Sequence, residues 1–200
     1  MFNFLSNKYK KFRQLYRSDF KIRDFVGKSN INLGCGNRPL PNFLNVDFYN
    51  KNHADIVFDI KQDWPIDEGS ADLIFSDNVF EHFSDIISLV KKCHSCLRSG
   101  GHLVVKVPYF KSKHAFVDPT HVKFFTIQSM DYFVEGKYFN SEYKFIDECF
   151  SSIDIFLDPG SNSFLRKVIA PYALMRPNLF ENSILSNLVV FHNIVYVLRK

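Results

Sequence analysis

Long apolar runs are absent from this sequence: no stretch approaches the roughly 18 uninterrupted apolar residues that a helix needs to span a bilayer. Its apolar opening, residues 1–5, is too short for the hydrophobic region of a signal peptide, and basic residues follow it instead of preceding it. We therefore expect a cytoplasmic protein.

Cysteine is scarce, and the four present do not indicate a disulfide framework in a reducing compartment. They are Cys35, Cys93, Cys96 and Cys149. Cys93 and Cys96 have the spacing of half a zinc site, but no second CxxC or HxxxH pair completes it. The apolar residues around them recur at helical spacing, so we expect both to be buried on a helix.

Internal repeats and Gly/Ser-rich linkers are also missing, and 200 residues suit one domain. We divide the chain into a basic helical leader, residues 1–28, and one domain, residues 29–200. The leader holds eight Lys and Arg against two Asp, whereas the rest holds 17 basic and 19 acidic residues. This balance disfavours a nucleic-acid partner for the main domain. The helix predicted at 7–26 either packs over the domain or contacts a membrane surface or RNA.

The sequence does contain a series of short apolar strands, predicted at residues 31–33, 43–48, 55–58, 71–75 and 102–107. Strands that are apolar at consecutive positions are typical of a parallel sheet covered on both faces. An amphipathic helix is predicted around residues 80–98, ended by Gly100 and Gly101. Two later segments, within 144–157 and 190–198, would add antiparallel strands.

The most informative pattern is a strand that runs directly into Gly34-Cys35-Gly36. Glycine lets the backbone approach a ligand without interference from a Cβ atom. Asp47 closes the next strand, where a carboxylate can accept hydrogen bonds from both ribose hydroxyls. Asp59 closes the third strand, where a carboxylate can accept from the adenine amine. Together these positions outline a site for an adenosine group.

A dinucleotide such as NAD fits this pattern less well. Its binding motif needs a third small residue, so that a full helix can direct its N-terminus at the pyrophosphate. Pro39 stands at that position, Pro41 follows, and only ten residues separate Gly36 from Asp47. A short crossover with little helix dipole suits S-adenosylmethionine, which has no phosphate.

The successive motifs resemble those of class I S-adenosylmethionine-dependent methyltransferases, and more narrowly the small bacterial methyltransferase type 11-like family, over about residues 29–133. The segments that carry the resemblance are Gly34-Cys35-Gly36, Asn45-Val46-Asp47, Asp72 to Ser76 with Glu81-His82, and Leu97 to Gly101 with Val107-Pro108. The resemblance implies an α/β, Rossmann-like three-layer sandwich with a mostly parallel seven-stranded sheet and an antiparallel last strand.

The resemblance also implies the residues that contact S-adenosylmethionine. The glycine turn would wrap the methionine part, with Asp47 on the ribose and Asp59 by the adenine. The methionine end would be flanked by the loop after the fourth strand. The predicted cofactor contacts are Gly34, Cys35, Gly36, Asn37, Asp47, Asp59, Asp77 and Asn78.

The loop after the fifth strand is predicted to receive the methyl acceptor, because ligands of open α/β sheets lie at the carboxyl ends of the strands. Within it, Asp118 to His121 resembles a segment of methyltransferase-like proteins from glycan gene clusters. Transfer to a hydroxyl needs a base, and we predict His121, with His114 second. Two alternatives stay open: His121 caps the next helix, or His114, Asp118 and His121 bind a metal. The predicted site includes no metal.

We therefore predict an S-adenosylmethionine-dependent methyltransferase that O-methylates a saccharide or related small metabolite. The alternatives are RNA or protein methylation and a non-catalytic partner protein that binds S-adenosylmethionine. Glu81-His82 is interpreted as the start of the helix after the fourth strand, with Glu81 as a fallback catalytic group. The apolar segment 161–189 would form a lid over the acceptor or a homodimer contact.

Overall fold

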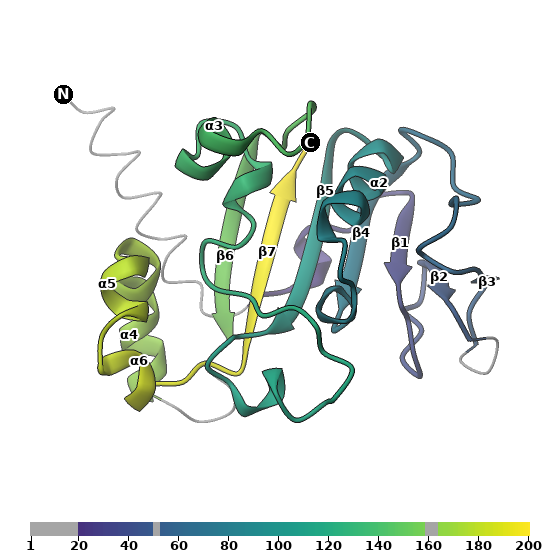
Figure 1. Ribbon diagram of the computed structural model, residues 1–200. Coiled ribbons are helices and arrows are strands. Elements are labelled where there is room, and N and C mark those ends of the chain that lie inside the picture. Colours follow the sequence, from purple (N-terminus) through teal and green to yellow (C-terminus); the bar gives the residue numbers. More distant parts are fainter. Residues whose placement is uncertain (1–19, 50–52, 159–163) are drawn as a thin grey trace.

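The computed structural model describes residues 20–49, 53–158 and 164–200 (Figure 1). They form a seven-stranded sheet in the order β3-β2-β1-β4-β5-β7-β6. β7 is antiparallel to both of its neighbours, and the remaining pairs are parallel, which confirms the predicted Rossmann-like sheet. The strands are β1 Asn30–Leu33, β2 Leu44–Asp47, β3 Ile56–Val57, β4 Ala71–Asp77, β5 Leu97–Pro108, β6 Ser152–Asp158 and β7 Asn193–Arg199.

The central strands are buried on both faces, as their continuous apolar sequences predict. All four residues of β1 and the first six of β4 are buried. Ile31, Leu33 and Ile74 contribute to the larger core on one face, and Leu73 and Phe75 to the smaller core on the other. The loops that follow the parallel strands meet at one edge, the lower edge in Figure 1. The candidate site must therefore lie at this edge.

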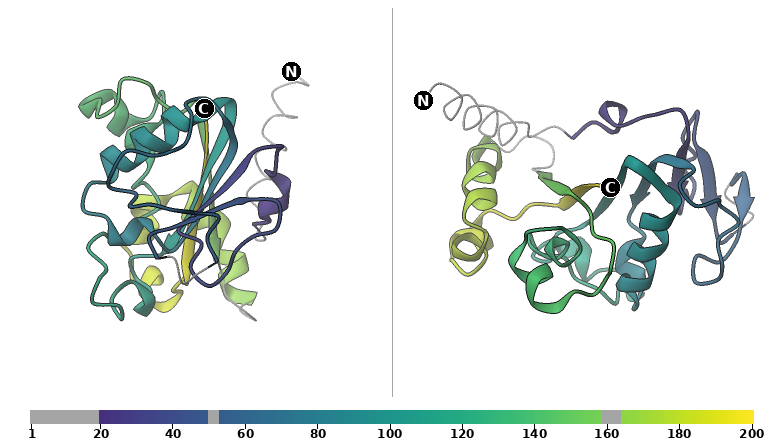
Figure 2. Two further views of the ribbon diagram at one scale, coloured as in Figure 1. Left: turned by 90° about the vertical axis from the view of Figure 1, so that its right-hand side faces the viewer. Right: turned by 90° about the horizontal axis from the view of Figure 1, so that it is seen from above.

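The larger core is covered by α2 Ile86–Cys96 and α3 Tyr138–Tyr143, which lie on the same side of the sheet in Figure 2. Asp85 caps α2 by accepting a hydrogen bond from the Ser88 backbone N–H at 2.9 Å. Cys93 and Cys96 are buried on this helix, which confirms their predicted placement.

The helix predicted over residues 80–98 is too long at both ends, because α2 covers only Ile86–Cys96. A separate 3-10 turn, η3 Phe80–His82, precedes α2, because the Asp85 cap starts the helix only at Ile86. At the other end Leu97 is extended and pairs with Ala71, so β5 begins there. Gly100, with φ of 78°, lies within the irregular start of β5 and does not end the helix.

The smaller core is covered by the segment that enters β1. Phe20 stacks on Phe25 at 5.9 Å between ring centroids and contacts Phe156 of β6 at 5.7 Å. This segment contains only the 3-10 turn η1 Ile22–Asp24, so the predicted leader helix does not continue through residue 26. Residues 7–19 of that prediction lie outside the described residues. No helix forms over residues 34–43, all of which are described, and this confirms the predicted short crossover.

An insertion separates β6 from β7, and it forms three short helices beside the β6 edge of the sheet (Figure 1). They are α4 Phe164–Met175, α5 Pro177–Glu181 and α6 Leu185–Leu188. Phe164, Leu179 and Ile184 are among their exposed apolar side chains. The two alternatives predicted for this segment, a lid over the acceptor and a homodimer contact, both stay predictions. In the described ranges, no helix combines the length and apolar character required to cross a bilayer.

Candidate active site

The turn after β1 is built from two glycines in left-handed conformations, Gly34 at φ 73° and Gly36 at φ 52°. The backbone N–H groups of Gly34 and Cys35 both donate to the Val46 carbonyl, at 2.8 and 2.9 Å. A Cβ atom on Gly36 would meet no heavy atom within 4 Å, whereas one on Gly34 would lie 2.3 Å from Cγ2 of Val79. One side of the turn therefore packs against the loop after β4, and the other is open to a ligand.

Replacing Gly34 by alanine is expected to destabilise the protein by roughly 2–4 kcal/mol, because left-handed strain adds to an overlap with Val79. Gly36→Ala is the matched control, since it introduces only the strain, on the order of 1–2 kcal/mol. Urea unfolding of both variants measures the difference. Adding Val79→Ala to Gly34→Ala should recover part of the loss. Equal destabilisation by the two glycine replacements would contradict the packing against Val79.

Asp47 holds this turn from the end of β2 and is buried. Its Oδ2 accepts a hydrogen bond from the Gly36 backbone N–H at 2.7 Å, and its Oδ1 accepts from the Tyr49 backbone N–H at 3.0 Å. Asp47 thus shapes the glycine turn from the end of β2, at the position predicted to meet the ribose hydroxyls.

The loop after β4 brings charged groups of both signs beside the turn. Lys106 Nζ lies 3.3 Å from both carboxylate oxygens of Asp77, and Arg38 Nη1 lies 3.9 Å from Oδ2. Asn78 is left-handed at φ 57°, and its side-chain amide donates to Asp77 Oδ1 at 3.0 Å. The sequence analysis missed Lys106, which lies on an otherwise apolar strand.

These groups fit the methionine end of S-adenosylmethionine. Its ammonium needs an anionic acceptor, which Asp77 provides, and its carboxylate needs donors, which Arg38 and Lys106 provide. The open side of Gly36 leaves room for the ligand beside them.

Within its described residues, the structure gives Asp59, Cys35 and Asn37, the remaining predicted cofactor residues, no arrangement that points to a ligand. Asp59 Oδ1 accepts from the Lys61 backbone N–H at 2.9 Å, which fixes a local turn after β3. Cys35 is buried. Its burial raises the pKa of the thiol, and the negative charge of Asp47 raises it further. Asn37 is exposed in the short crossover. The adenine contact of Asp59 and all the other predicted cofactor contacts stay predictions.

A second cluster forms where the loop after β5 crosses the loop after β4. The backbone N–H groups of Val122 and Lys123 donate to the Glu81 carbonyl, at 2.8 and 3.1 Å. This crossing places His121 beside Glu81 and His82, with His121 Nε2 3.8 Å from Glu81 Oε1. The imidazole rings of His82 and His121 lie 4.7 Å apart between centroids. The donor atoms of Glu81, His82 and His121 all lie within 4.8 Å of one another.

Hydrogen bonds determine which nitrogen of each imidazole carries a proton. His121 Nδ1 lies 3.0 Å from the Ala115 carbonyl, which can only accept, so Nδ1 donates. The Thr120 hydroxyl donates to Asp118 Oδ1 at 2.6 Å and therefore accepts from His82 Nδ1 at 2.8 Å. In the neutral form of each imidazole, the lone pair then lies on Nε2.

Glu81 is the unusual member of the cluster, since it is 1% exposed and neither carboxylate oxygen has a hydrogen-bond partner within the described ranges. Burial raises the pKa of Glu81 to about 7, and the nearby charges of Asp77 and Asp118 add to the effect. Burial also lowers the pKa of His82, with a smaller contribution from His121. The cluster thus combines two imidazoles with a buried carboxyl group whose pKa lies near 7.

The structure separates His114, the second predicted base, from this cluster. His114 is exposed in η4 Lys113–Ala115, and its ring lies 5.7 Å from that of His192. The alternative metal set of His114, Asp118 and His121 is therefore not assembled. The sequence analysis interpreted Glu81-His82 as a helix start and missed His82. The available signal was an acid and a histidine directly after the fourth strand, at the ligand-binding edge.

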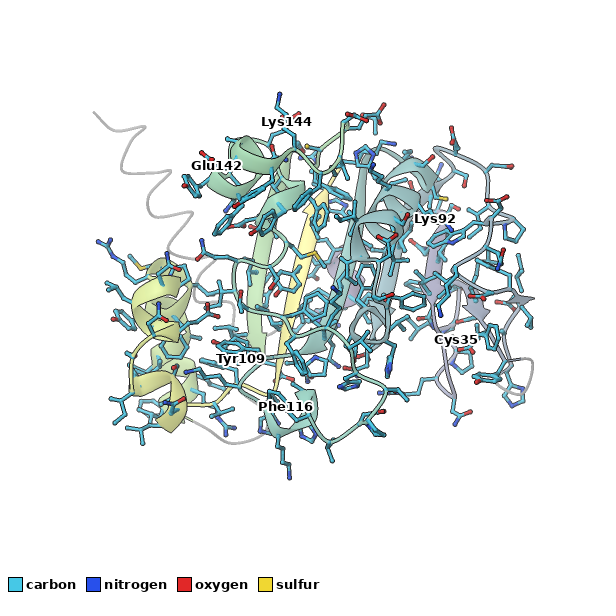
Figure 3. All side chains as sticks on the ribbon, in the orientation of Figure 1. Cys35, Lys92, Tyr109, Phe116, Glu142 and Lys144 are labelled. Carbon is cyan, nitrogen blue, oxygen red and sulfur yellow. The ribbon has the colours of Figure 1, made fainter. Side chains whose placement is uncertain are left out.

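The acceptor loop, residues 109–127, is anchored to the insertion between β6 and β7. Tyr109 Oη and the Ile127 backbone N–H both donate to Glu181 Oε1, at 3.0 and 2.9 Å. Between these anchors the exposed rings of Phe116 and Phe124 stack at 4.8 Å. Figure 3 shows Tyr109 and Phe116 near the lower edge, below the end of β5, with Cys35 on the β1 side.

Comparison with known proteins supports one family. Residues 33–105 match the family model described as "Methyltransferase domain". The match covers the glycine turn, Asp47, Asp77 and both Glu81 and His82. No curated protein sequence matches the chain significantly.

Solved structures of methyltransferases share the fold. An S-adenosylmethionine-dependent methyltransferase from Archaeoglobus fulgidus is 12% identical, with TM-score 0.55 over 99% of this chain and 94% of its own. One from Thermotoga maritima is 14% identical, with TM-score 0.55 over 100% and 98%. Phosphoethanolamine N-methyltransferase 2 from Haemonchus contortus, in complex with S-adenosylhomocysteine, is 12% identical, with TM-score 0.52 over 96% and 52%.

Residues 33–105 are similar to the methyltransferase domain, and the chain as a whole has the fold of S-adenosylmethionine-dependent methyltransferases. This domain and the glycine turn held by the buried carboxylate of Asp47 indicate methyl transfer with S-adenosylmethionine as the cofactor.

Proposed function

We propose that this methyltransferase transfers the methyl group to a hydroxyl of a saccharide or related small metabolite. The observation that carries the proposal is the cluster of Glu81, His82 and His121 at the acceptor edge, in which Nδ1 of each histidine makes a hydrogen bond. A hydroxyl is a weak nucleophile until its proton is removed, so groups that can accept a proton are needed there. An amine acceptor that is neutral before transfer would not need such a cluster.

The chain's residues divide the work between two sides of the site. The glycine turn, Asp47 and Asp77 bind and orient the cofactor. Bound there, S-adenosylmethionine supplies a methyl carbon that bonds to the acceptor oxygen as its bond to sulfur breaks, and S-adenosylhomocysteine leaves with the electron pair. His121 accepts the hydroxyl proton at Nε2, and the Ala115 carbonyl holds its ring through Nδ1. Alignment of the two reactants supplies much of the remaining acceleration.

The exposed aromatic pair favours a saccharide over other hydroxyl compounds. Phe116 and Phe124 lie on either side of His121 in the sequence, and Phe116 is 63% exposed. The apolar C–H face of a pyranose ring can stack on such a surface while its hydroxyls reach polar groups. Aromatic walls with a few polar groups are typical of small-molecule sites.

An acceptor screen with methyl-labelled S-adenosylmethionine tests the proposal. Neutral saccharides and nucleotide sugars are offered in parallel with short RNA and peptide mixtures. We expect label on a saccharide oxygen, with S-adenosylhomocysteine formed in equal amount. The matched control is the same saccharide lacking the labelled hydroxyl, which should accept nothing. Labelling confined to RNA or peptide would overturn the proposal.

A further inference from the structure

Glu81 is buried without a partner that explains its burial. The side chain is 1% exposed, and within the described residues neither oxygen has a hydrogen-bond partner. Burial of a carboxylate is strongly unfavourable unless a counter-charge or hydrogen bonds compensate it. The nearest basic atom in its ion pairs is His121 Nε2, at 3.8 Å. A carboxylate oxygen of Glu81 and one ring nitrogen of each histidine lie within 4.8 Å of one another.

We infer that Glu81, His82 and His121 bind a divalent transition-metal cation beside the methyl acceptor. Two imidazole nitrogens and one carboxylate oxygen form a donor set that Zn²⁺, Mn²⁺ and related ions accept. Three protein ligands leave at least one coordination position open, as in catalytic metal sites.

The histidines are already oriented as metal ligands usually are. Each Nδ1–H donates to an oxygen, the Ala115 carbonyl for His121 and the Thr120 hydroxyl for His82. Such bonds fix the ring and leave Nε2 for the metal. Thr120 in turn donates to Asp118. The hydrogen bonds from Thr120 hold the pKa of the Asp118 carboxyl below its ordinary value. Asp118 therefore stays ionised and strengthens His82 as a ligand through Thr120.

The geometry needs only a small contraction to accept an ion. Ligand atoms bound at about 2.1 Å to one cation lie roughly 3.0–3.4 Å apart. The separation of 3.8 Å between His121 Nε2 and Glu81 Oε1 closes to that range by less than about 1 Å. All three donor atoms lie within 4.8 Å of one another, so side-chain rotations suffice.

The charges around the cluster favour a cation. Glu81 lies near the carboxylates of Asp77 and Asp118, which both disfavour a further negative charge. Lys106 and Arg38 are the basic groups at Asp77. A divalent ion would compensate Glu81 and reduce the repulsion among the three acids.

The chemical role of the ion rests on the proposed transfer to a hydroxyl. A cation held by these three residues would lower the pKa of a hydroxyl bound to it, so that the hydroxyl would release its proton to solvent without a base of matched pKa. His121 is then a ligand, and direct proton transfer to its Nε2 describes only the metal-free protein. A second oxygen of the acceptor can occupy another open position. The substrate class therefore narrows to acceptors with adjacent hydroxyls, such as the vicinal diols of saccharides.

Titration of the chelator-treated, dialysed full chain with Mn²⁺, followed by electron paramagnetic resonance, tests the metal site. We expect one ion per chain, displaced by Zn²⁺. Glu81→Gln, His82→Ala and His121→Ala should each weaken Mn²⁺ binding on the order of 100-fold. His114→Ala, an exposed histidine of the same loop, should bind Mn²⁺ like the wild type. Unchanged S-adenosylhomocysteine affinity shows that each variant is folded.

The outcomes separate this inference from the proposed function. No Mn²⁺ or Zn²⁺ binding by a chain that binds S-adenosylhomocysteine would overturn the metal site and leave transfer to a hydroxyl intact. Stoichiometric binding that survives both Glu81→Gln and His121→Ala would place the ion elsewhere and also overturn it. Saccharide methylation that persists at full rate in excess chelator would overturn the role of the metal. Stoichiometric binding lost in all three variants supports the site, whichever acceptor is methylated.

Discussion

Replacing His121 by alanine is expected to lower the turnover number by roughly 100-fold or more, with no change in affinity for S-adenosylhomocysteine. The side chain of His121 is 8% exposed and lies on the acceptor loop, apart from the glycine turn and Asp47. Its loss removes the Nε2 atom beside Glu81, whether that atom accepts the proton or holds a cation. Single-turnover kinetics with a saccharide acceptor and calorimetry with S-adenosylhomocysteine measure the two quantities.

His114→Ala is the comparison for this prediction, because it removes an imidazole from the same loop but outside the cluster. We expect a much smaller effect on turnover. Equal losses in the two variants would show that the structure does not distinguish their roles. Full activity in both would remove His114 and His121 from the mechanism and leave Glu81 and His82 as the remaining proton acceptors of the cluster.

Replacing Asp47 by alanine is expected to weaken binding of S-adenosylhomocysteine by about 1–3 kcal/mol, or roughly ten- to 100-fold. The ribose would lose a charged acceptor. The Gly36 and Tyr49 backbone N–H groups would lose theirs as well, so the turn itself would loosen. Calorimetry on the folded variant measures the change.

Asp47→Asn is the graded control, because an amide keeps one acceptor oxygen in nearly the same volume. It can satisfy only one of the two backbone N–H groups, so we expect an intermediate loss of affinity. A folded Asp47→Ala variant with wild-type affinity would mean that the ribose is bound elsewhere.

The cofactor side was predictable because its contacts are local in sequence. Gly34, Gly36 and Asp47 stand at the ends of adjacent strands, and their spacing indicates the turn before any tertiary contact is known. The short crossover was predictable for the same reason, since Pro39 and Pro41 disfavour a helix. The mostly parallel seven-stranded sheet with an antiparallel last strand then followed from the resemblance, and the structure confirms it.

The acceptor side was less predictable, because His121 meets Glu81 only where two loops cross. The hydrogen bonds of Val122 and Lys123 to the Glu81 carbonyl join residues about 40 positions apart, and no periodicity encodes them. The apolar spacing of Phe83, Ile86 and Ile87 suggested one long helix, although Asp85 is a cap that starts it later. The predicted leader helix ran too far toward residue 26. Phe20 and Phe25 looked like the apolar face of a helix, but in the structure they pack on the sheet without forming one.

The anchoring of the acceptor loop by Glu181 has a consequence for the order of assembly. The bond between Gly36 and Asp47 spans 11 positions, so the cofactor turn can close while most of the chain is still being synthesised. The bonds from Ile127 and Tyr109 to Glu181 span 54 and 72 positions. Contacts between distant positions form late in folding, because a long loop must first be closed. A nascent chain can therefore organise its cofactor turn well before the surface that selects the acceptor exists.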